Sequence, residues 1–219
     1  MKQPIYQIIV CAGLLASCAG NPEGEKAVTT EEQQVAAASG MAYATDSSST
    51  ITWTGTKPTG KHIGTFAVKE GNLFADNGTL TGGNFTIDIN SLLDLDMAGD
   101  PKSKGDLEGH LKSPDFFDVA KFPTAKFEIT SVMPADSAAM AKLKDATHVI
   151  SGNLTMKDST KNISFPAKLM MDSSSITAQA DFNIDRSQWG MNYKGPENPA
   201  DWVISKEVNL KLAISAKRK

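Results

Sequence analysis

The side chains best suited to chemistry in this 219-residue chain are its three histidines, His62, His110 and His148. A histidine metal site usually draws two ligands from positions such as i and i+2 or i+4, and no two of these histidines have that spacing. The chain also lacks the glycine-rich and serine-centred motifs of nucleotide-binding and hydrolytic enzymes. The sequence therefore predicts neither a metal site nor a particular reaction.

His62 is the histidine with the clearest binding potential, because it shares strand parity with Gly64 and Phe66 and is expected to point inward. There it either hydrogen-bonds a ligand head group or is held by a backbone carbonyl at the end of the strand. Arg186 presents a similar choice between an ion pair with Asp185 and contact with a phosphate head group.

The elements that would position these side chains are strands. Apolar and polar residues alternate over residues 163–171, and the same period of two recurs at 50–56, 62–74, 85–89, 125–129, 150–156, 176–184 and 208–216. This alternation is typical of strands with one buried and one wet face. We therefore predict a mostly β fold, an eight-stranded antiparallel barrel of the lipocalin-like kind, since about eight strands enclose room for side chains or one ligand.

One or two short helices are expected to cap this barrel. Leu107 and Leu111 are four residues apart within residues 100–113, which indicates one narrow helical stripe that Pro114 ends. His110 lies at the end of that helix, where it either caps carbonyls or lines the mouth of the barrel. Residues 137–143 are the second helical candidate.

The predicted interior mixes large and small side chains, which leaves its use open. Phe85, Phe127, Phe165 and Phe182 alternate with glycines and alanines. The small residues either make room for a ligand or fit opposite the large ones in a filled core.

For four further aromatic residues the sequence also leaves two positions open. Trp53 and Trp189 either line a pocket or fill the core. Of the adjacent Phe116 and Phe117, one is expected to plug the end of the barrel and the other to pack under the helix, because neighbouring side chains in an extended segment point opposite ways.

The beginning of the chain indicates export. Lys2 precedes a short apolar run that ends in Leu-Ala-Ser-Cys18, a pattern typical of a secretory signal peptide and similar to the bacterial lipoprotein box. We predict a signal peptide over residues 1–17, lipidation at Cys18, a flexible tether over 18–46 and the barrel over 47–219. Cys11 and Cys18 are the only cysteines, so the barrel has none for a disulfide.

Charge narrows the range of partners. The net charge is −3 and the isoelectric point is near 5.6, with no basic stripe apart from the last three residues. Nucleic acid is therefore not an expected partner.

Four segments, read in order, resemble one known family. They are TGKHIGTF at residues 59–66, HLKSPDFFDVAKFPTAKF at 110–127, GNLTMKDSTKNISFP at 152–166 and FNIDRSQWGMNY at 182–193. Together they resemble the YceI-like family, secreted bacterial proteins whose lipocalin-like barrel binds polyisoprenoid-type lipids, and the resemblance covers residues 47–216.

The resemblance implies a carrier or store for a polyisoprenoid, an isoprenoid quinone or a similar lipid, with no other cofactor. The candidate ligand contacts are Trp53, His62, Phe66, Phe85, Leu111, Phe117, Phe127, Phe165, Phe182, Arg186 and Trp189. Lipid on Cys18 would anchor the protein in the cell envelope, facing the periplasm or the cell surface, and Ala19 after the cysteine favours the outer membrane.

Two alternatives remain at this point. One is an enzyme that acts on a small lipid or envelope metabolite, with His62 and a nearby carboxylate as acid and base. The other is a filled barrel that serves as a stress-related interaction module. The sequence leaves the oligomeric state open, a dimer included.

Overall fold

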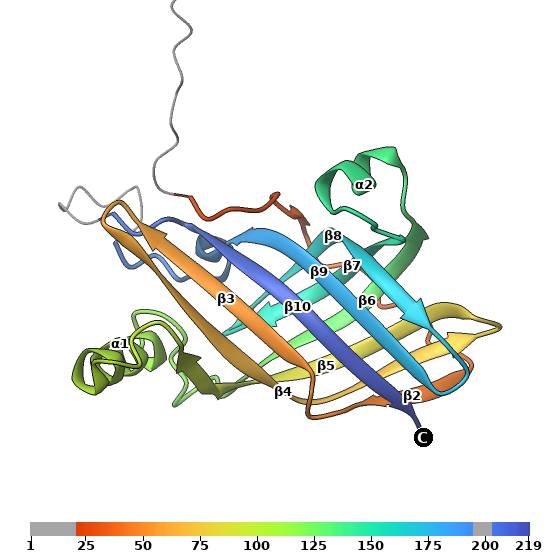
Figure 1. Cartoon of the computed structure of the whole chain (residues 1–219), viewed down its shortest axis with the longest axis horizontal. Coiled ribbons are helices and arrows are strands. Elements are labelled where there is room, and N and C mark those ends of the chain that lie inside the picture. Colours follow the sequence, from red (N-terminus) through yellow and green to blue (C-terminus); the bar gives the residue numbers. More distant parts are fainter. Residues whose placement is uncertain (1–20, 195–202) are drawn as a thin grey trace, which may run out of the picture.

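The computed structural model describes residues 21–194 and 203–219, and its centre is a closed antiparallel barrel (Figure 1). Each strand pairs with the next along the chain, and the last closes the ring on the first. The eight strands are β3 (Thr50–Lys57), β4 (Gly60–Asp76), β5 (Thr79–Asp94), β6 (Thr124–Pro134), β7 (His148–Met156), β8 (Ser159–Met171), β9 (Ser175–Asp185) and β10 (Glu207–Arg218). The predicted fold class is confirmed.

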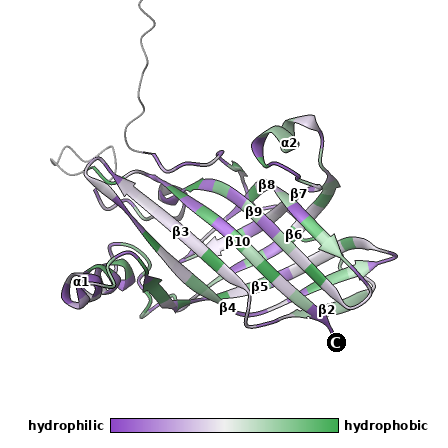
Figure 2. Ribbon diagram, viewed as in Figure 1, coloured by the Kyte–Doolittle hydropathy of each residue, from purple (hydrophilic) through white to green (hydrophobic). Residues whose placement is uncertain are grey.

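Period-two alternation places the core inside this barrel. Ile163, Phe165, Ala167 and Leu169 of β8 are all buried, and Figure 2 shows the same banding of hydrophobic and hydrophilic residues along β9 and β10. Within the described residues, no helix is both long and apolar enough to cross a membrane. The signal peptide and Cys18 lie outside the described residues.

The helices form close to the predicted positions. Helix α1 (Pro101–Lys112) begins where the Asp100 side chain accepts a hydrogen bond from the Ser103 N–H, and it ends just before Pro114. Helix α2 (Ser137–Lys142) begins in the same way, with Asp136 bonded to the Ala139 N–H. A short 3-10 helix, η1 (Arg186–Trp189), follows β9.

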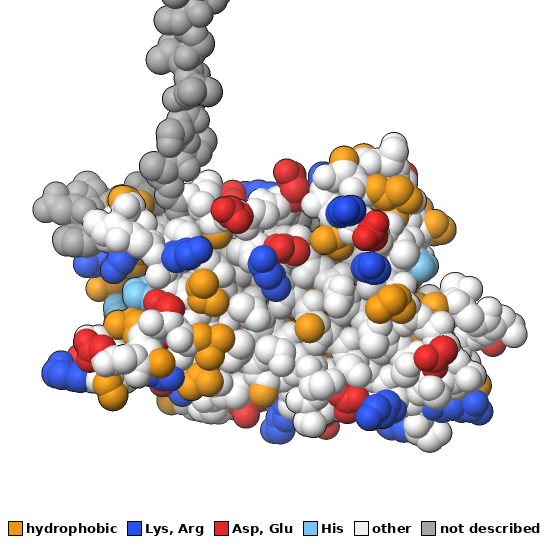
Figure 3. Space-filling view, in the orientation of Figure 1, with side chains coloured by type: hydrophobic (Ala, Val, Ile, Leu, Met, Phe, Trp, Pro, Cys, Tyr) orange, Lys and Arg blue, Asp and Glu red, His pale blue; other side chains and the backbone are white. Residues whose placement is uncertain are grey.

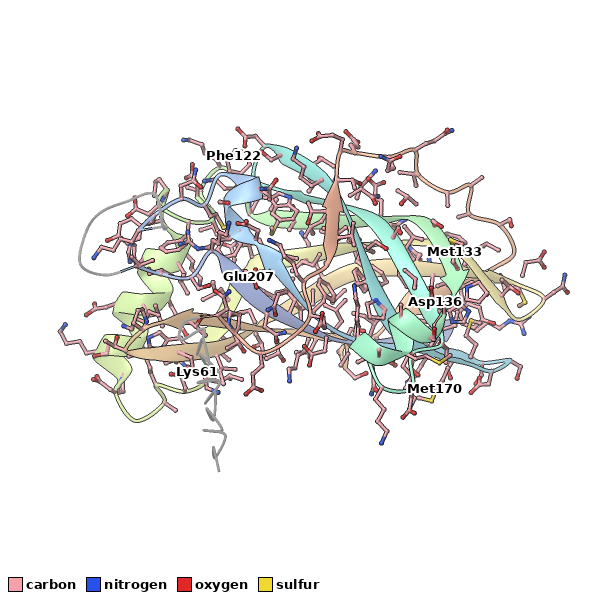
Figure 4. All side chains as sticks on the ribbon, turned by 90° about the horizontal axis from the view of Figure 1, so that it is seen from above. Lys61, Phe122, Met133, Asp136, Met170 and Glu207 are labelled. Atoms are coloured by element: carbon pink, nitrogen blue, oxygen red, sulfur yellow. The ribbon has the colours of Figure 1, made fainter. Side chains whose placement is uncertain are left out.

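Helices α1 and α2 belong to opposite ends of the barrel. Figure 4 places Lys61 at the end that carries α1, and Met133 and Met170 at the other. In the space-filling view, basic and acidic side chains are interspersed on the visible face, and hydrophobic side chains gather around α2 (Figure 3). Met133, Met140 and Met170 are exposed there.

The segment before the barrel differs from the prediction of a flexible tether. Strand β1 (Val28–Thr30) pairs with β8, and Ala27 is buried. The Asn183 amide donates to the carbonyls of Pro22 and Gly24, and Asn153 exchanges hydrogen bonds with the backbone of Gln33. Asparagines on the outer face of the barrel thus form hydrogen bonds with the backbone of this segment. Its side chains are mostly polar, so the sequence did not suggest that it packs on the barrel.

Strand β2 (Met41–Thr45) also lies within the predicted tether. It pairs with β4 on one side and with the end of β10 on the other, in line with β3. Tyr43 is buried there. The ordered domain therefore begins well before residue 47.

Candidate functional site

A cavity of about 370 Å³ occupies the α1 end of the barrel. Its walls combine inward-facing residues of the strands with Leu107 and Leu111, the two leucines of the helical stripe. Most of the remaining wall is aliphatic or aromatic, including Trp53, Phe66, Ile87, Phe116, Phe117, Leu154, Met156, Ile184 and Leu210. Helix α1 therefore closes one side of an apolar chamber.

A second cavity of about 100 Å³ lies deeper, and its walls share Ile51, Ile87, Leu154 and Leu210 with the first. Four of the six phenylalanines predicted to contact a ligand, Phe85, Phe127, Phe165 and Phe182, line this inner cavity. The rings of Phe165 and Phe182 are stacked, with centroids 4.0 Å apart, and those of Phe127 and Phe165 are 5.9 Å apart. These rings fill much of the interior, so the free space narrows away from α1.

The small inward-facing residues have both of the uses that the sequence left open: some fit opposite large side chains, and others leave room for a ligand. The ring of Phe127 covers Gly152, where an added Cβ would lie 2.2 Å from Phe127 Cζ. Gly55, by contrast, lines the larger cavity, and nothing lies within 4 Å of a Cβ added there. The barrel is therefore filled at Gly152 and hollow at Gly55.

The edge of the larger cavity is polar and partly basic. Thr56 and Lys57 at the end of β3, Tyr193 and Lys194 after η1, and Ser205 before β10 all contribute to its lining. This edge provides hydrogen-bonding groups and positive charge beside an apolar chamber.

Trp53 is buried in the wall of the cavity, and its indole N–H has no hydrogen-bond partner among the described residues. Burying a donor without an acceptor is unfavourable, so a ligand oxygen in the cavity would satisfy it. Trp53 thus lines the cavity, and its contact with a ligand stays a prediction.

His62 lies at the edge of the same cavity, as strand parity predicted. Its Nδ1 is 3.0 Å from Oδ2 of Asp96, a residue that follows β5. Burial acts to raise the pKa of the Asp96 carboxyl, but hydrogen bonds from the Ile63 N–H and the His62 ring outweigh it and lower that pKa. A carboxylate, rather than a backbone carbonyl, therefore holds the His62 ring.

His110 also lines the cavity, with Nε2 3.0 Å from Oδ2 of Asp115. Its ring makes edge contacts with the rings of Phe116 and Tyr193. Phe117 packs edge-on against Phe66 on the strand side. Phe116 thus packs against α1 and Phe117 against the strand side, and both side chains line the cavity.

Arg186 has a role that was not among the predicted ones, and its contact with a ligand head group stays a prediction. Its guanidinium donates to the backbone carbonyls of Met191, Tyr193, Ile204 and Ser205. It also lies over the Phe116 ring, 5.7 Å from the centroid. Arg186 lines the cavity, but it acts there by holding the segments on either side of the mouth.

Asp185 pairs with Lys26 and Lys206 within the described part of the chain, and not with Arg186. Burial acts to raise the pKa of Asp185, but hydrogen bonds from the Ser187 hydroxyl and N–H and the charge of Lys206 lower it overall. The predicted ion pair between Asp185 and Arg186 was wrong because each group has better-placed partners.

Trp189 was predicted as a ligand contact, and the structure places it elsewhere. Its side chain is fully buried, and its indole N–H donates to the Leu154 carbonyl at 2.9 Å. Trp189 lines neither cavity and fills the core where η1 packs on the barrel. The other ten predicted contacts line one of the two cavities.

Sequence reasoning missed several residues of the site. Tyr193 and Met191 line the cavity and lie within the FNIDRSQWGMNY segment, which was the available signal. Asp94 and Asp96 approach His62 only in the folded barrel, and their spacing in the sequence carried no signal.

Comparison with known proteins agrees with this fold and cavity. The YceI-like domain matches residues 43–216, most of the described chain. Protein YceI of Salmonella arizonae and of Salmonella paratyphi B are each 36% identical over 107 residues, which cover 49% of this chain and 44% of the relative. The matched part thus spans less than half the length of these curated relatives.

Two solved structures share the fold. BcnA of Burkholderia cenocepacia superposes with a TM-score of 0.57 at 20% sequence identity, covering 78% of this chain and 99% of that one. A polyisoprenoid binding domain from Saccharophagus degradans, implicated in plant cell wall breakdown, superposes with a TM-score of 0.56 at 17% identity, covering 82% and 99%. These structures share the barrel, and the match of the YceI-like domain over residues 43–216 shows that this chain belongs to the YceI-like family.

Proposed function

We propose that this protein binds one long apolar lipid of the isoprenoid type, such as a polyisoprenoid or an isoprenoid quinone, and carries or stores it unchanged. The observation that carries the proposal is the apolar cavity of about 370 Å³ with a polar, basic edge. This volume lies in the usual range for small-molecule sites, about 300–1,000 Å³.

The tail and the head of such a ligand would use different parts of the cavity. Each methylene group that leaves water for the apolar chamber contributes about 0.8 kcal/mol, so the tail supplies most of the affinity. The Trp53 N–H is suited to an oxygen of the ligand, and Lys57 and Lys194 at the edge favour a head group with acceptor atoms or negative charge. The structural neighbour from Saccharophagus degradans, a polyisoprenoid binding domain, supports the same ligand class.

The proposal places this barrel in the bacterial cell envelope. A signal peptide over residues 1–17 and lipid on Cys18 would export the chain and anchor it at the outer membrane, facing the periplasm or the cell surface. Mass spectrometry of the mature N-terminus tests this: cleavage before Cys18 with acyl chains on that residue supports it, and an unmodified Cys18 contradicts it.

The binding experiment compares lipid recovered from the wild type and from a variant with a blocked cavity. Gly55→Phe places a ring into the cavity at a position with open space for a Cβ. Gly105→Phe is the matched control, because Gly105 is exposed on α1 and has equally open surroundings. Each full chain is purified from its own host and extracted with organic solvent, and the extract is analysed by mass spectrometry.

One discrete lipid that is present with the wild type and Gly105→Phe, and depleted in Gly55→Phe, supports the proposal. Equal lipid content in all three proteins means that the lipid adheres elsewhere, and contradicts it. Incubation of the purified protein with the recovered lipid then separates a carrier from an enzyme: a carrier returns the lipid unchanged, whereas an enzyme that uses His62 and Asp96 converts it.

A further inference from the structure

Three potential metal-ligating side chains meet at the edge of the cavity, on the side of the barrel that Lys61 marks in Figure 4. They are His62 on β4, Asp94 at the end of β5, and Asp96 just after it. One ligand atom from each residue lies within 4.8 Å of the others. The barrel brings them together because β5 runs antiparallel to β4 with Asp94 opposite Gly64, two residues from His62.

The two carboxylates are held in similar ways. Oδ1 of Asp94 accepts a hydrogen bond from the Met97 N–H at 2.8 Å, and Oδ1 of Asp96 accepts one from the Ile63 N–H at 2.6 Å. Backbone donors thus fix one oxygen of each carboxylate. Such outer hydrogen bonds are the usual means of orienting metal ligands.

The second oxygen of Asp94 is the unusual feature of this cluster. Asp94 has 0% of its surface exposed, and its Oδ2 has no hydrogen-bond partner among the described residues. A buried carboxylate oxygen without a donor requires either a proton or a cation beside it. The Asp96 carboxylate lies in the same cluster, so two negatively charged groups would face each other there without a counter-ion.

We propose that His62, Asp94 and Asp96 bind a divalent transition-metal ion, with Zn²⁺ as the representative ion. One imidazole and two carboxylates suit such an ion better than Ca²⁺ or Mg²⁺, which prefer oxygen ligands alone. Three protein ligands leave positions open for water or another donor. His62 also lines the cavity, so an open position would be available to an oxygen of a bound ligand.

The test titrates the full chain, stripped with a chelator and free of any affinity tag, with ZnCl₂ by calorimetry. We expect one saturable site that tenfold excess Mg²⁺ does not block. Asp94→Asn, which keeps the shape of the side chain, and His62→Ala should each weaken Zn²⁺ binding at least tenfold. Co²⁺ in place of Zn²⁺ should give visible absorption bands that both variants lose.

Two control variants have comparable chemistry away from this cluster. Asp115→Asn removes a carboxylate that also lies 3.0 Å from a histidine nitrogen, and His148→Ala removes a partly exposed imidazole. Both should bind Zn²⁺ like the wild type. His62 is partly exposed, so its variant keeps the test usable if buried Asp94→Asn fails to fold.

Absence of a saturable site in the wild type would overturn the proposal and assign a shared proton to the two carboxylates. Zn²⁺ binding that persists at full strength in the folded His62→Ala variant would also overturn it. The titration uses lipid-free protein, so a negative result here leaves the proposed lipid binding untouched.

Discussion

The indole of Trp53 lies directly over Gly64, where a Cβ would come within 2.3 Å of Trp53 Cζ2 and 2.2 Å of the Leu93 carbonyl oxygen. The two residues are also paired across strands β3 and β4. The absence of a side chain at residue 64 therefore sets the position of the Trp53 ring in the cavity wall.

Gly64→Ala should destabilise the protein by about 1–3 kcal/mol, because the methyl group meets both the indole and a backbone carbonyl that cannot move freely. Urea unfolding monitored by tryptophan fluorescence measures this change. Gly55→Ala on β3 is the control, since its added methyl group meets nothing, and we expect its stability to be unchanged or higher by about 0.4–1 kcal/mol. Equal stabilities for the two variants would contradict the packing argument.

Trp53→Phe should weaken the binding of an isoprenoid quinone by about 0.5–1.5 kcal/mol more than that of a ligand without oxygen, because the smaller phenyl ring keeps an aromatic surface but lacks the buried N–H donor. Titration followed by fluorescence quenching or calorimetry gives the affinity. Squalene, an isoprenoid hydrocarbon without oxygen, is the control ligand and should bind the variant with a smaller loss. A loss of the same size for both ligands would mean that the indole acts only through its apolar surface.

Arg186→Lys should cost about 2–4 kcal/mol of stability, because a lysine cannot reach four backbone carbonyls with one ammonium group. Chemical denaturation measures the loss, and Arg218→Lys at the exposed end of β10 is the matched control. Lipid content should fall with Arg186→Lys, since Met191 and Tyr193 line the cavity. Unchanged stability and lipid content would show that only the positive charge matters.

Asp172 makes stability depend on pH in the acid range. The N–H and hydroxyl groups of Ser174 and Ser175 lower its pKa from the ordinary 3.8 to about 2. A carboxyl whose pKa is lower in the folded state stabilises fully above its unfolded pKa, and this contribution is lost as pH falls from about 3.8 to about 2.

Asp172→Asn should therefore be less stable than the wild type at pH 6, and the difference should shrink as pH falls toward 2. Urea midpoints at steps between these values measure it. Asp76→Asn, at the exposed end of β4, controls for the general loss of one negative charge. A constant difference between wild type and Asp172→Asn at every pH would contradict the assignment.

Much of this architecture could be predicted because its signals are local. The alternation from Ile163 to Met171 appears in the structure as β8, and the leucines at 107 and 111 face the cavity from α1. The inward position of His62 followed from parity with Gly64, since strand parity depends only on neighbouring residues.

Other features of the structure could not be predicted, because they depend on contacts between segments that are far apart in the sequence. The N-terminal segment is mostly polar, and Asn153 and Asn183 on the outside of the barrel hold it by hydrogen bonds to its backbone. The sequence suggested Trp189 as a pocket residue, but its N–H donates a hydrogen bond to the carbonyl of Leu154, 35 residues away in the sequence. No local pattern could indicate these contacts.

The sequence by itself determined that this chain forms a barrel with an apolar interior and a helix near its mouth, because periodicity and helix-ending residues act within a few positions. Only the tertiary structure decided where the barrel is hollow, since rings from different strands compete for the same interior space. The tertiary structure also places Asp94 and Asp96 beside His62, because the pairing register of β5 on β4 brings these residues together.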